Sequence, residues 1–184
     1  MIQTNTADFY FAPQDQIQAA ILNAADIEVL ELCMGMYGFH LPPLRDQFIK
    51  NHENGLAQFL LLDLSQEAGK VEHPDVVAII NAGIDVVIGT SPYHNILHSK
   101  YLLAKKQCLV LSGSYNFSLS AAEQDNTLQA FYNSQVWDAY RTHFTNARQW
   151  CLDNEPQDQI KAALTAGRSI EQMSMVERAV RFPS

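Results

Sequence analysis

Four polar side chains in one stretch of the chain could act together on a phosphate. His98 and Lys100 are two residues apart, and an apolar run separates them from Ser114 and Asn116. Successive side chains of a strand alternate between the faces of a sheet, so each pair shares a face. If the two strands pair, an imidazole, an ammonium, a hydroxyl and a carboxamide meet at one end of the sheet. This set suits metal-free phosphoryl transfer through histidine.

The same residues also allow a simpler interpretation. A histidine and a lysine near the start of a strand commonly mark a solvated edge, and Gly-Ser-x-Asn commonly marks a turn. Spacing by itself favours this second interpretation over the catalytic one.

The elements that must position these groups alternate between strands and helices. Apolar periodicity predicts helices at 13–24, 42–55, 73–83 and 134–152, and strands at 8–12, 27–39, 56–65, 84–91 and 127–133. A hairpin of strands 97–104 and 108–116 carries the polar set. Strands separated by helices of this length predict an α/β fold with a mostly parallel sheet covered on both faces.

The totals indicate one globular domain. The chain has 184 residues, of which 47% are hydrophobic, so it can form a sizeable core. We expect one domain over residues 1–152, and residues 153–184 as a helical C-terminal extension of the same unit. Residues 153–159 are predicted as a linker, and two short amphipathic helices are predicted after it. No secretory signal and no apolar run long enough to span a bilayer is visible, so we predict a cytoplasmic protein without stable membrane association.

Charge and cysteine content exclude some classes of protein. The formal net charge of −8 argues against a protein that coats DNA by charge alone. Three scattered cysteines are too few for a disulfide framework or a zinc site.

Longer motifs carry a resemblance to a known family. The segments "HSK", "GSYNFS" and "AAEQDN" resemble the H-x-K…G-S-x-N signature of the phospholipase D superfamily. Together with "MYGF" and "INAGIDVVIGTSP", they are similar to the small single-motif endonucleases of the Nuc type and their Zucchini-like relatives. The resemblance runs from about residue 8 to residue 150. It implies an α/β/α sandwich with a mixed, mostly parallel central sheet.

The resemblance also implies roles for individual residues. His98 would attack phosphorus and form a covalent phosphohistidine, while Lys100 and Asn116 would hold the non-bridging oxygens. Ser114 would support that phosphate pocket. An acidic residue just after the Gly-Ser-x-Asn strand orients the histidine in this family, and Asp125 is the best match here, with Glu123 as the alternative. No metal and no cofactor is implied.

One motif cannot supply both a nucleophile and a general acid. The resemblance therefore implies a homodimer in which His98 of the partner subunit protonates the leaving oxygen. DNA or RNA is the expected substrate. His94, in the loop before His98, and Lys105, in the hairpin turn, are candidate substrate-binding residues.

One departure from the family lies in the hairpin turn. Lys105 stands where the family has an aspartate, an odd number of residues from His98. On a regular strand that position points away from His98, so we predict that its loss changes the hairpin and leaves catalysis possible. Two other functions stay open: a phospholipase D-type phospholipid hydrolase, and a binding or scaffold protein with a relaxed site.

Overall fold

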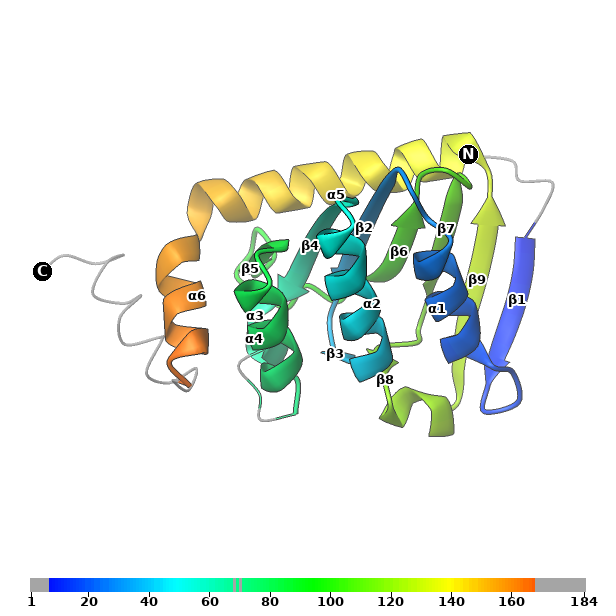
Figure 1. The fold of residues 1–184 in the computed structure, drawn as a ribbon, viewed down its shortest axis with the longest axis horizontal. Helices are drawn as coiled ribbons and strands as arrows, with labels where there is room; N and C mark the ends of the chain where they lie inside the picture. Colours follow the sequence, from blue (N-terminus) through cyan, green and yellow to red (C-terminus); the bar gives the residue numbers. More distant parts are fainter. Residues whose placement is uncertain (1–6, 68, 70, 168–184) are drawn as a thin grey trace, which may run out of the picture.

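The computed structural model describes residues 7–67, 69 and 71–167, and these form one mixed α/β unit (Figure 1). The described strands are β1 Ala7–Ala12, β2 Glu31–Met36, β3 Phe39–His40, β4 Ala57–Asp63, β5 Asp85–Gly89, β6 Lys100–Ala104, β7 Leu109–Gly113, β8 Phe117–Ser118 and β9 Asn126–Tyr132. The described helices are α1 Ile17–Asp26, α2 Pro42–Glu53, α3 Leu64–Glu67, α4 His73–Asn81, the 3₁₀ turn η1 Ser120–Glu123, α5 Ser134–Asn154 and α6 Gln157–Thr165.

Seven of the described strands form the central sheet, in the order β1-β9-β7-β6-β2-β4-β5. The predicted α/β fold, with a mixed sheet flanked by helices, is confirmed. The expectation that parallel pairs predominate is wrong, because β2–β4 and β4–β5 are the only parallel pairs among the described strands of this sheet. The β6–β7 hairpin pairs antiparallel with β2 and β9, and β1 pairs antiparallel with β9. A short hairpin turn cannot supply the crossover that a parallel pair needs.

Helices cover both faces of this sheet. In Figure 1, α1, α2 and α4 lie on one face, over a core that includes Ile21, Phe48 and Ile79. The other face packs against α5 through Phe144 and Cys151. The 21 residues of α5 give a helix about 31 Å long, which matches the width of a seven-stranded sheet.

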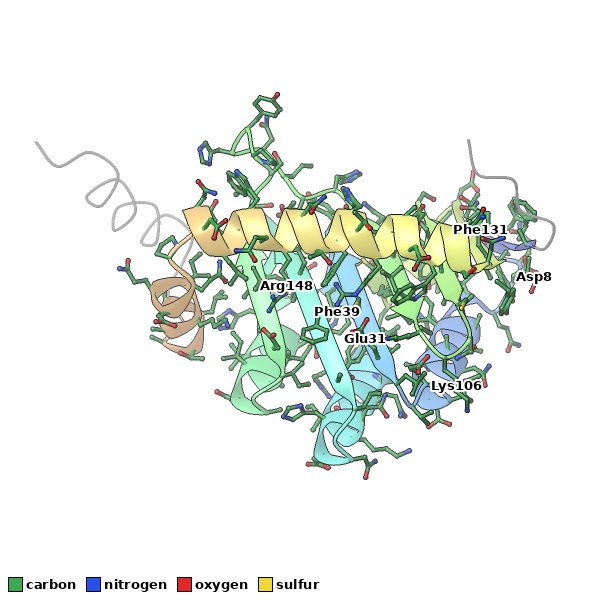
Figure 2. The ribbon with its side chains drawn as sticks, turned by 90° about the horizontal axis from the view of Figure 1, so that it is seen from above. Asp8, Glu31, Phe39, Lys106, Phe131 and Arg148 are labelled. Carbon is green, nitrogen blue, oxygen red and sulfur yellow. The ribbon has the colours of Figure 1, made fainter. Side chains whose placement is uncertain are left out.

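α5 crosses the strands of the sheet, as the view from above shows (Figure 2), and two ion pairs attach it to them. Arg141 Nε lies 2.9 Å from Glu31 Oε1, and Arg148 pairs with Asp85 at the start of β5. The helix begins at a capping residue, because Asn133 Oδ1 accepts hydrogen bonds from the backbone N–H groups of Gln135 and Val136.

The chain continues from α5 into α6 without a separate linker. Residues 153 and 154, predicted as the start of a linker, belong to α5. α6 packs on α4 and β5 and buries Ile160 and Leu164. The Gln157 amide also pairs with the backbone of Ile88 on the edge strand, at 3.0 and 2.9 Å. The second helix predicted in the extension lies outside the described residues, and the boundary at residue 152 stays a prediction.

A buried carboxylate anchors the hairpin turn where the family has its aspartate. Glu28 is 3% exposed. One of its oxygens accepts the backbone N–H groups of Val29 and Leu30, and the other accepts the Lys106 N–H at 2.8 Å. The turn between β6 and β7 is thereby attached to the loop that enters β2.

We predict that Glu28→Ala lowers the free energy of unfolding by about 2–3 kcal/mol, because three backbone donors lose a charged acceptor. Chemical denaturation measures this loss. Asp26→Ala is the control, because Asp26 is exposed and its ion pair with Lys50 is worth at most about 1 kcal/mol. Equal losses in the two variants would contradict the anchoring role of Glu28.

A second buried carboxyl has no partner. Glu67 is fully buried, and neither of its oxygens has a hydrogen-bond partner in the described part of the chain. Burial raises its pKa well above the ordinary value, and the nearby Glu72, Asp63 and Asp75 raise it further. The folded state therefore holds this proton at pH values where the unfolded state has lost it, so stability falls as the pH rises through that range.

We predict that Glu67→Met raises the free energy of unfolding by about 1–3 kcal/mol at pH 7, and by less at pH 5. The variant removes both the unpaired polar group and the linked proton. Denaturation of both proteins at the two pH values measures the gain, with the exposed Glu53→Gln as the control. A gain that does not depend on pH would contradict the linkage.

Candidate active site

The pairing of β2 with β6 positions the two candidate catalytic residues of the first motif. Met36 is opposite Lys100, and Tyr37 N–H donates to the Ser99 carbonyl at 2.8 Å. β6 begins at Lys100, so His98 lies in the loop before the strand, where the sequence had predicted regular strand. His98 and Lys100 nevertheless meet beside the residue that follows β2.

That residue is Tyr37, whose ring contacts both groups. The His98 imidazole lies edge-on to the Tyr37 ring, with 4.7 Å between the ring centroids. Lys100 Nζ lies 4.9 Å from the centroid of the same ring. The Tyr37 hydroxyl accepts a hydrogen bond from Gln66 Nε2 at 2.9 Å, which fixes the ring from α3. Tyr37 is therefore a positioning residue for the imidazole and the ammonium.

The Lys100 side chain is largely shielded from solvent. The residue is 7% exposed, and Nζ donates to the His98 carbonyl oxygen at 3.2 Å. Burial lowers the pKa of Lys100, and the Asp63 carboxylate opposes that shift. A buried cation with few partners gains most when an anion such as a phosphate oxygen approaches it.

Asp63 fixes the loop that carries His98. It is the last residue of β4 and is fully buried. Its Oδ2 accepts the Leu97 N–H at 2.6 Å, and its Oδ1 accepts the Ser65 N–H at 2.9 Å and also bonds the Ser65 hydroxyl. Because Leu97 precedes His98, this carboxylate holds the main chain on which the imidazole depends.

Asn116 and Ser114 follow β7 and differ in their hydrogen bonds. The Asn116 amide lies against Gly38, where a Cβ would come 3.5 Å from Asn116 Cγ, and its Oδ1 is buried without a partner among the described residues. Ser114 Oγ accepts the Thr127 N–H at 2.9 Å and donates to Asn126 Oδ1 at 3.0 Å. Asn116 is thus placed against Gly38, the residue after Tyr37, whereas Ser114 joins the end of β7 to β9.

The two candidate acids lie on the exposed side of η1 and β9. Asp125 and Glu123 are both exposed. Within the described residues, neither makes a hydrogen bond or ion pair with His98. The orientation of His98 by one of them stays a prediction.

His94 lies in a loop that projects beside α5. Its φ of 55° lies in the left-handed region, and its ring packs against Trp150 with 5.8 Å between centroids. A pocket of about 470 Å³ lies between this loop and α5, lined by residues that include Ile96, Leu97, His98, His143 and Trp150. His94 is therefore at the rim of a pocket that reaches His98.

Lys105 is not brought to the site. It is exposed in the turn at the end of β6 opposite to Lys100, about 16 Å away for five residues of strand. Its N–H donates to the Glu31 carbonyl at 3.1 Å.

Sequence reasoning missed two residues that position this site. Tyr37 lies in the segment "MYGF", which had been used for the resemblance alone, and Asp63 ends a buried strand. A carboxylate at the end of an otherwise apolar strand is a signal that could have identified Asp63.

The described residues contain neither a metal-binding cluster nor a membrane-spanning helix. Within 7–67, 69 and 71–167, no three His, Cys, Asp or Glu side chains are grouped so that they could hold a metal ion. None of the described helices is both long and apolar enough to cross a bilayer.

Solved structures with this fold include two small proteins that the chain covers almost completely. Nuc from Salmonella typhimurium, a phospholipase D family member, has a TM-score of 0.69 at 19% identity, over 77% of this chain and 93% of Nuc. NucT from Helicobacter pylori has a TM-score of 0.66 at 13% identity, over 77% of this chain and 94% of NucT. A phosphatidylserine synthase from Haemophilus influenzae has a TM-score of 0.56 at 12% identity, over 94% of this chain and 45% of the synthase.

The sequence itself gives a family match. A search of the curated proteins found no match. Residues 17–150, which run from the start of α1 almost to the end of α5, match the family described as cardiolipin synthase, PLD-like domain. The fold and this match agree with the H-x-K and G-S-x-N motifs, and the chain belongs to the phospholipase D superfamily.

Proposed function

We propose that the protein is a metal-independent phosphodiesterase that cleaves single-stranded DNA or RNA through a covalent phosphohistidine. Superfamily membership supports phosphodiester chemistry in general. The observation that carries the finer proposal is the placement of His98 and Lys100 against one Tyr37 ring, with Asn116 against Gly38, the residue that follows Tyr37.

In the first step, an imidazole nitrogen of His98 attacks phosphorus. The bond from phosphorus to the leaving oxygen breaks as the bond from phosphorus to nitrogen forms. Lys100 and Asn116 hold the non-bridging oxygens, where negative charge is concentrated in the transition state. Ser114 keeps the end of β7 against β9 and so supports the position of Asn116.

The reaction needs a proton donor and later a base. In the proposed homodimer, His98 of the partner subunit protonates the leaving oxygen, and then removes a proton from the water that hydrolyses the phosphohistidine. Hydrolysis breaks the bond from phosphorus to nitrogen and restores His98. Two chains related by a two-fold axis would present two such sets to one phosphate.

The charge of the chain favours a single strand over a duplex as substrate. A net charge of −8 supplies no broad basic surface for duplex binding. The pocket beside His98 is lined by Trp150 and His143, and aromatic rings can stack on unpaired bases. Nuc and NucT share this fold, and the motifs of this chain resemble those of the Nuc-type endonucleases.

The same pocket supports one other candidate substrate. Leu61, Ile96 and Leu97 give it an apolar part, and the family match and a structural neighbour include proteins named for phospholipid synthesis. Phospholipid hydrolysis is therefore the second candidate function. Release of choline from phosphatidylcholine vesicles, without cleavage of oligonucleotides, would establish it in place of the nuclease.

We expect hydrolysis of a labelled single-stranded oligonucleotide in EDTA, and a loss of at least about 10³-fold in kcat for His98→Ala, because no other group replaces the nucleophile. Gel analysis of the products measures both. His52→Gln, at the far end of α2, is the control and should keep wild-type kcat. A requirement for added metal, or unchanged activity of His98→Ala, would refute the mechanism.

A mixture of subunits tests whether each site needs two chains. If one phosphate requires both His98 side chains, equal amounts of wild type and His98→Ala should keep about a quarter of the wild-type activity after subunit exchange, because random pairing gives that share of intact dimers. Independent sites would keep half. Light scattering on the same samples shows whether the chains are paired.

A further inference from the structure

The short strands β3 and β8 carry a second set of polar side chains, next to the candidate catalytic residues. They pair in parallel, with Phe39 opposite Phe117 and His40 opposite Ser118. Both phenylalanines are fully buried. Because side chains alternate along a strand, His40 and Ser118 point to the opposite face from the two phenylalanines; His40 is partly exposed there, whereas Ser118 is only 9% exposed.

Asn116 lies directly before this pair of strands. It precedes Phe117 by one residue, and its amide is in contact distance of the position where Gly38 would carry a Cβ. The Ser118 N–H donates to the Asn116 carbonyl at 2.8 Å, so the chain turns tightly between these two residues. His40 and Ser118 therefore lie next to Gly38 and Asn116 on their respective segments.

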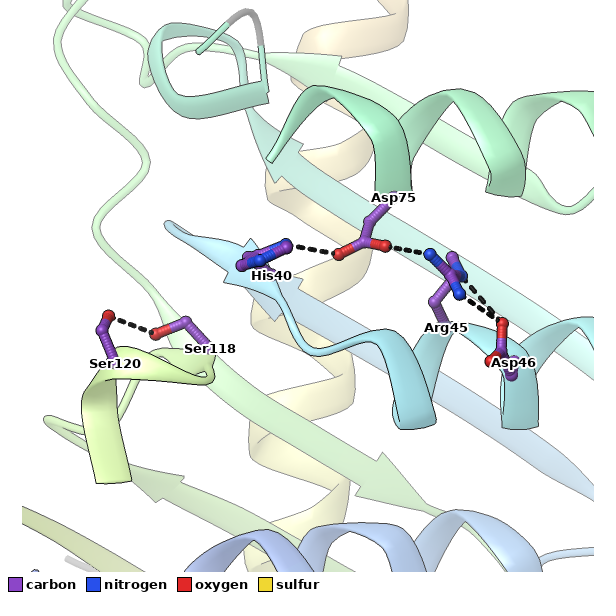
Figure 3. Close-up of polar contacts among 6 residues, drawn as sticks. All are labelled: His40, Arg45, Asp46, Asp75, Ser118 and Ser120. Carbon is purple, nitrogen blue, oxygen red and sulfur yellow. Dashed lines mark hydrogen bonds and ion pairs between the residues drawn. The ribbon is translucent and has the colours of Figure 1, made fainter. Parts of the chain in front are cut away.

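His40 is held in one orientation by a buried carboxylate (Figure 3). Its Nδ1 lies 2.8 Å from Asp75 Oδ2, and Arg45 Nη1 lies 2.6 Å from Asp75 Oδ1. Asp75 is 1% exposed and belongs to the first turn of α4, where the helix dipole also favours negative charge. Arg45 is in turn paired with Asp46 at 2.7 Å.

This arrangement leaves one nitrogen of the His40 ring, Nε2, available to contact a ligand. The Nδ1–H donates to Asp75, which fixes the tautomer, and Nε2 has no hydrogen-bond partner among the described residues. The His40 side chain is 28% exposed. When a proton is taken up at Nε2, the ring becomes a charged donor to a phosphate oxygen, with Asp75 and Arg45 behind it.

Two hydroxyls complete the surface. Ser118 Oγ lies 3.4 Å from Ser120 Oγ at the start of η1 (Figure 3). The Leu119 N–H, between them, donates to the His40 carbonyl at 2.9 Å, which ties η1 to β3. An imidazole and two hydroxyls on a fixed backbone supply donors of the kinds that contact phosphate oxygens.

We propose that His40, Ser118 and Ser120 form a subsite for the phosphate adjacent to the one that is cleaved. The proposal rests on the proposed nuclease function and specifies its substrate as a strand with at least two neighbouring phosphates. A phospholipid with one phosphate would leave this subsite empty. The subsite therefore separates the two candidate substrates by chemistry.

The informative variant is His40→Asn. The asparagine amide nitrogen takes the place of Nδ1 and can still donate to Asp75, whereas the Nε2 edge is lost. A merely structural role would be rescued by asparagine, and a contact with substrate would not. The matched control is His52→Gln, a histidine on α2 that lies away from β3 and β8.

The readout is the ratio of kcat/KM for a single-stranded trinucleotide to kcat/KM for bis(p-nitrophenyl) phosphate, which has one phosphate. We expect His40→Asn to lower this ratio about tenfold, mainly through KM for the trinucleotide, and Ser118→Ala to lower it by a smaller factor. The salt dependence of trinucleotide binding should lose about 0.7 in its log–log slope. An unchanged ratio in His40→Asn would overturn the subsite.

A binding measurement separates the two proposals. Fluorescence anisotropy of a labelled trinucleotide on the His98→Ala background reports the subsite without turnover, and His40→Asn added to it should weaken binding about tenfold. If the wild type cleaves neither substrate but this loss is seen, the nuclease proposal fails and the subsite stands. If binding is absent or insensitive to His40→Asn, the subsite fails.

Discussion

The register between β2 and β6 is the constraint on which the rest of the site depends. Because Met36 pairs with Lys100, the end of β2 lies beside the start of β6, which runs antiparallel to it. Tyr37 then meets His98 and Lys100, and the next residues, Gly38 to His40, run alongside Asn116 to Ser118. A shift by one residue would turn every side chain of β6 to the other face, so Lys100 would exchange places with Tyr101.

Buried carboxylates of this acidic chain hold separate parts of the fold in place. Asp63 holds the His98 loop, Asp75 holds His40 and Arg45, and Glu28 holds the hairpin turn. Glu67, which is also buried, has no hydrogen-bond partner in the described residues, and burial raises its pKa well above the ordinary value. The paired carboxylates thus fix loops and side chains of the fold.

The hairpin turn shows how a departure from a family motif can be absorbed. Lys105 replaces the expected aspartate, yet the turn it begins is far from His98 along β6 and is anchored through Lys106 by Glu28. The strand argument, that this position serves the hairpin and not the phosphate, agrees with the place of Lys105. Residues that belong to one sequence motif therefore need not all lie close to the reacting atoms.

Local pattern determined much of the fold. Apolar periodicity identified α1, α2, α4, α5 and the strands of the large sheet to within a few residues, because burial of one helical or strand face imposes its period on the sequence. It also placed His98 and Lys100 together, since residues two apart share a face of an extended segment. It did not give strand direction, because antiparallel pairing of β6 with β2 depends on where a whole hairpin docks.

The contacts that make a site were decided by tertiary structure. Tyr37, Asp63 and the His40–Asp75–Arg45 group join residues from β2, β3, β4, α2 and α4 that are separated by up to 61 positions, as between Tyr37 and His98. No local period relates such residues, because their proximity follows from strand order and loop closure. The sequence by itself determined which groups can do phosphoryl chemistry, and the three-dimensional packing decided which neighbours orient them.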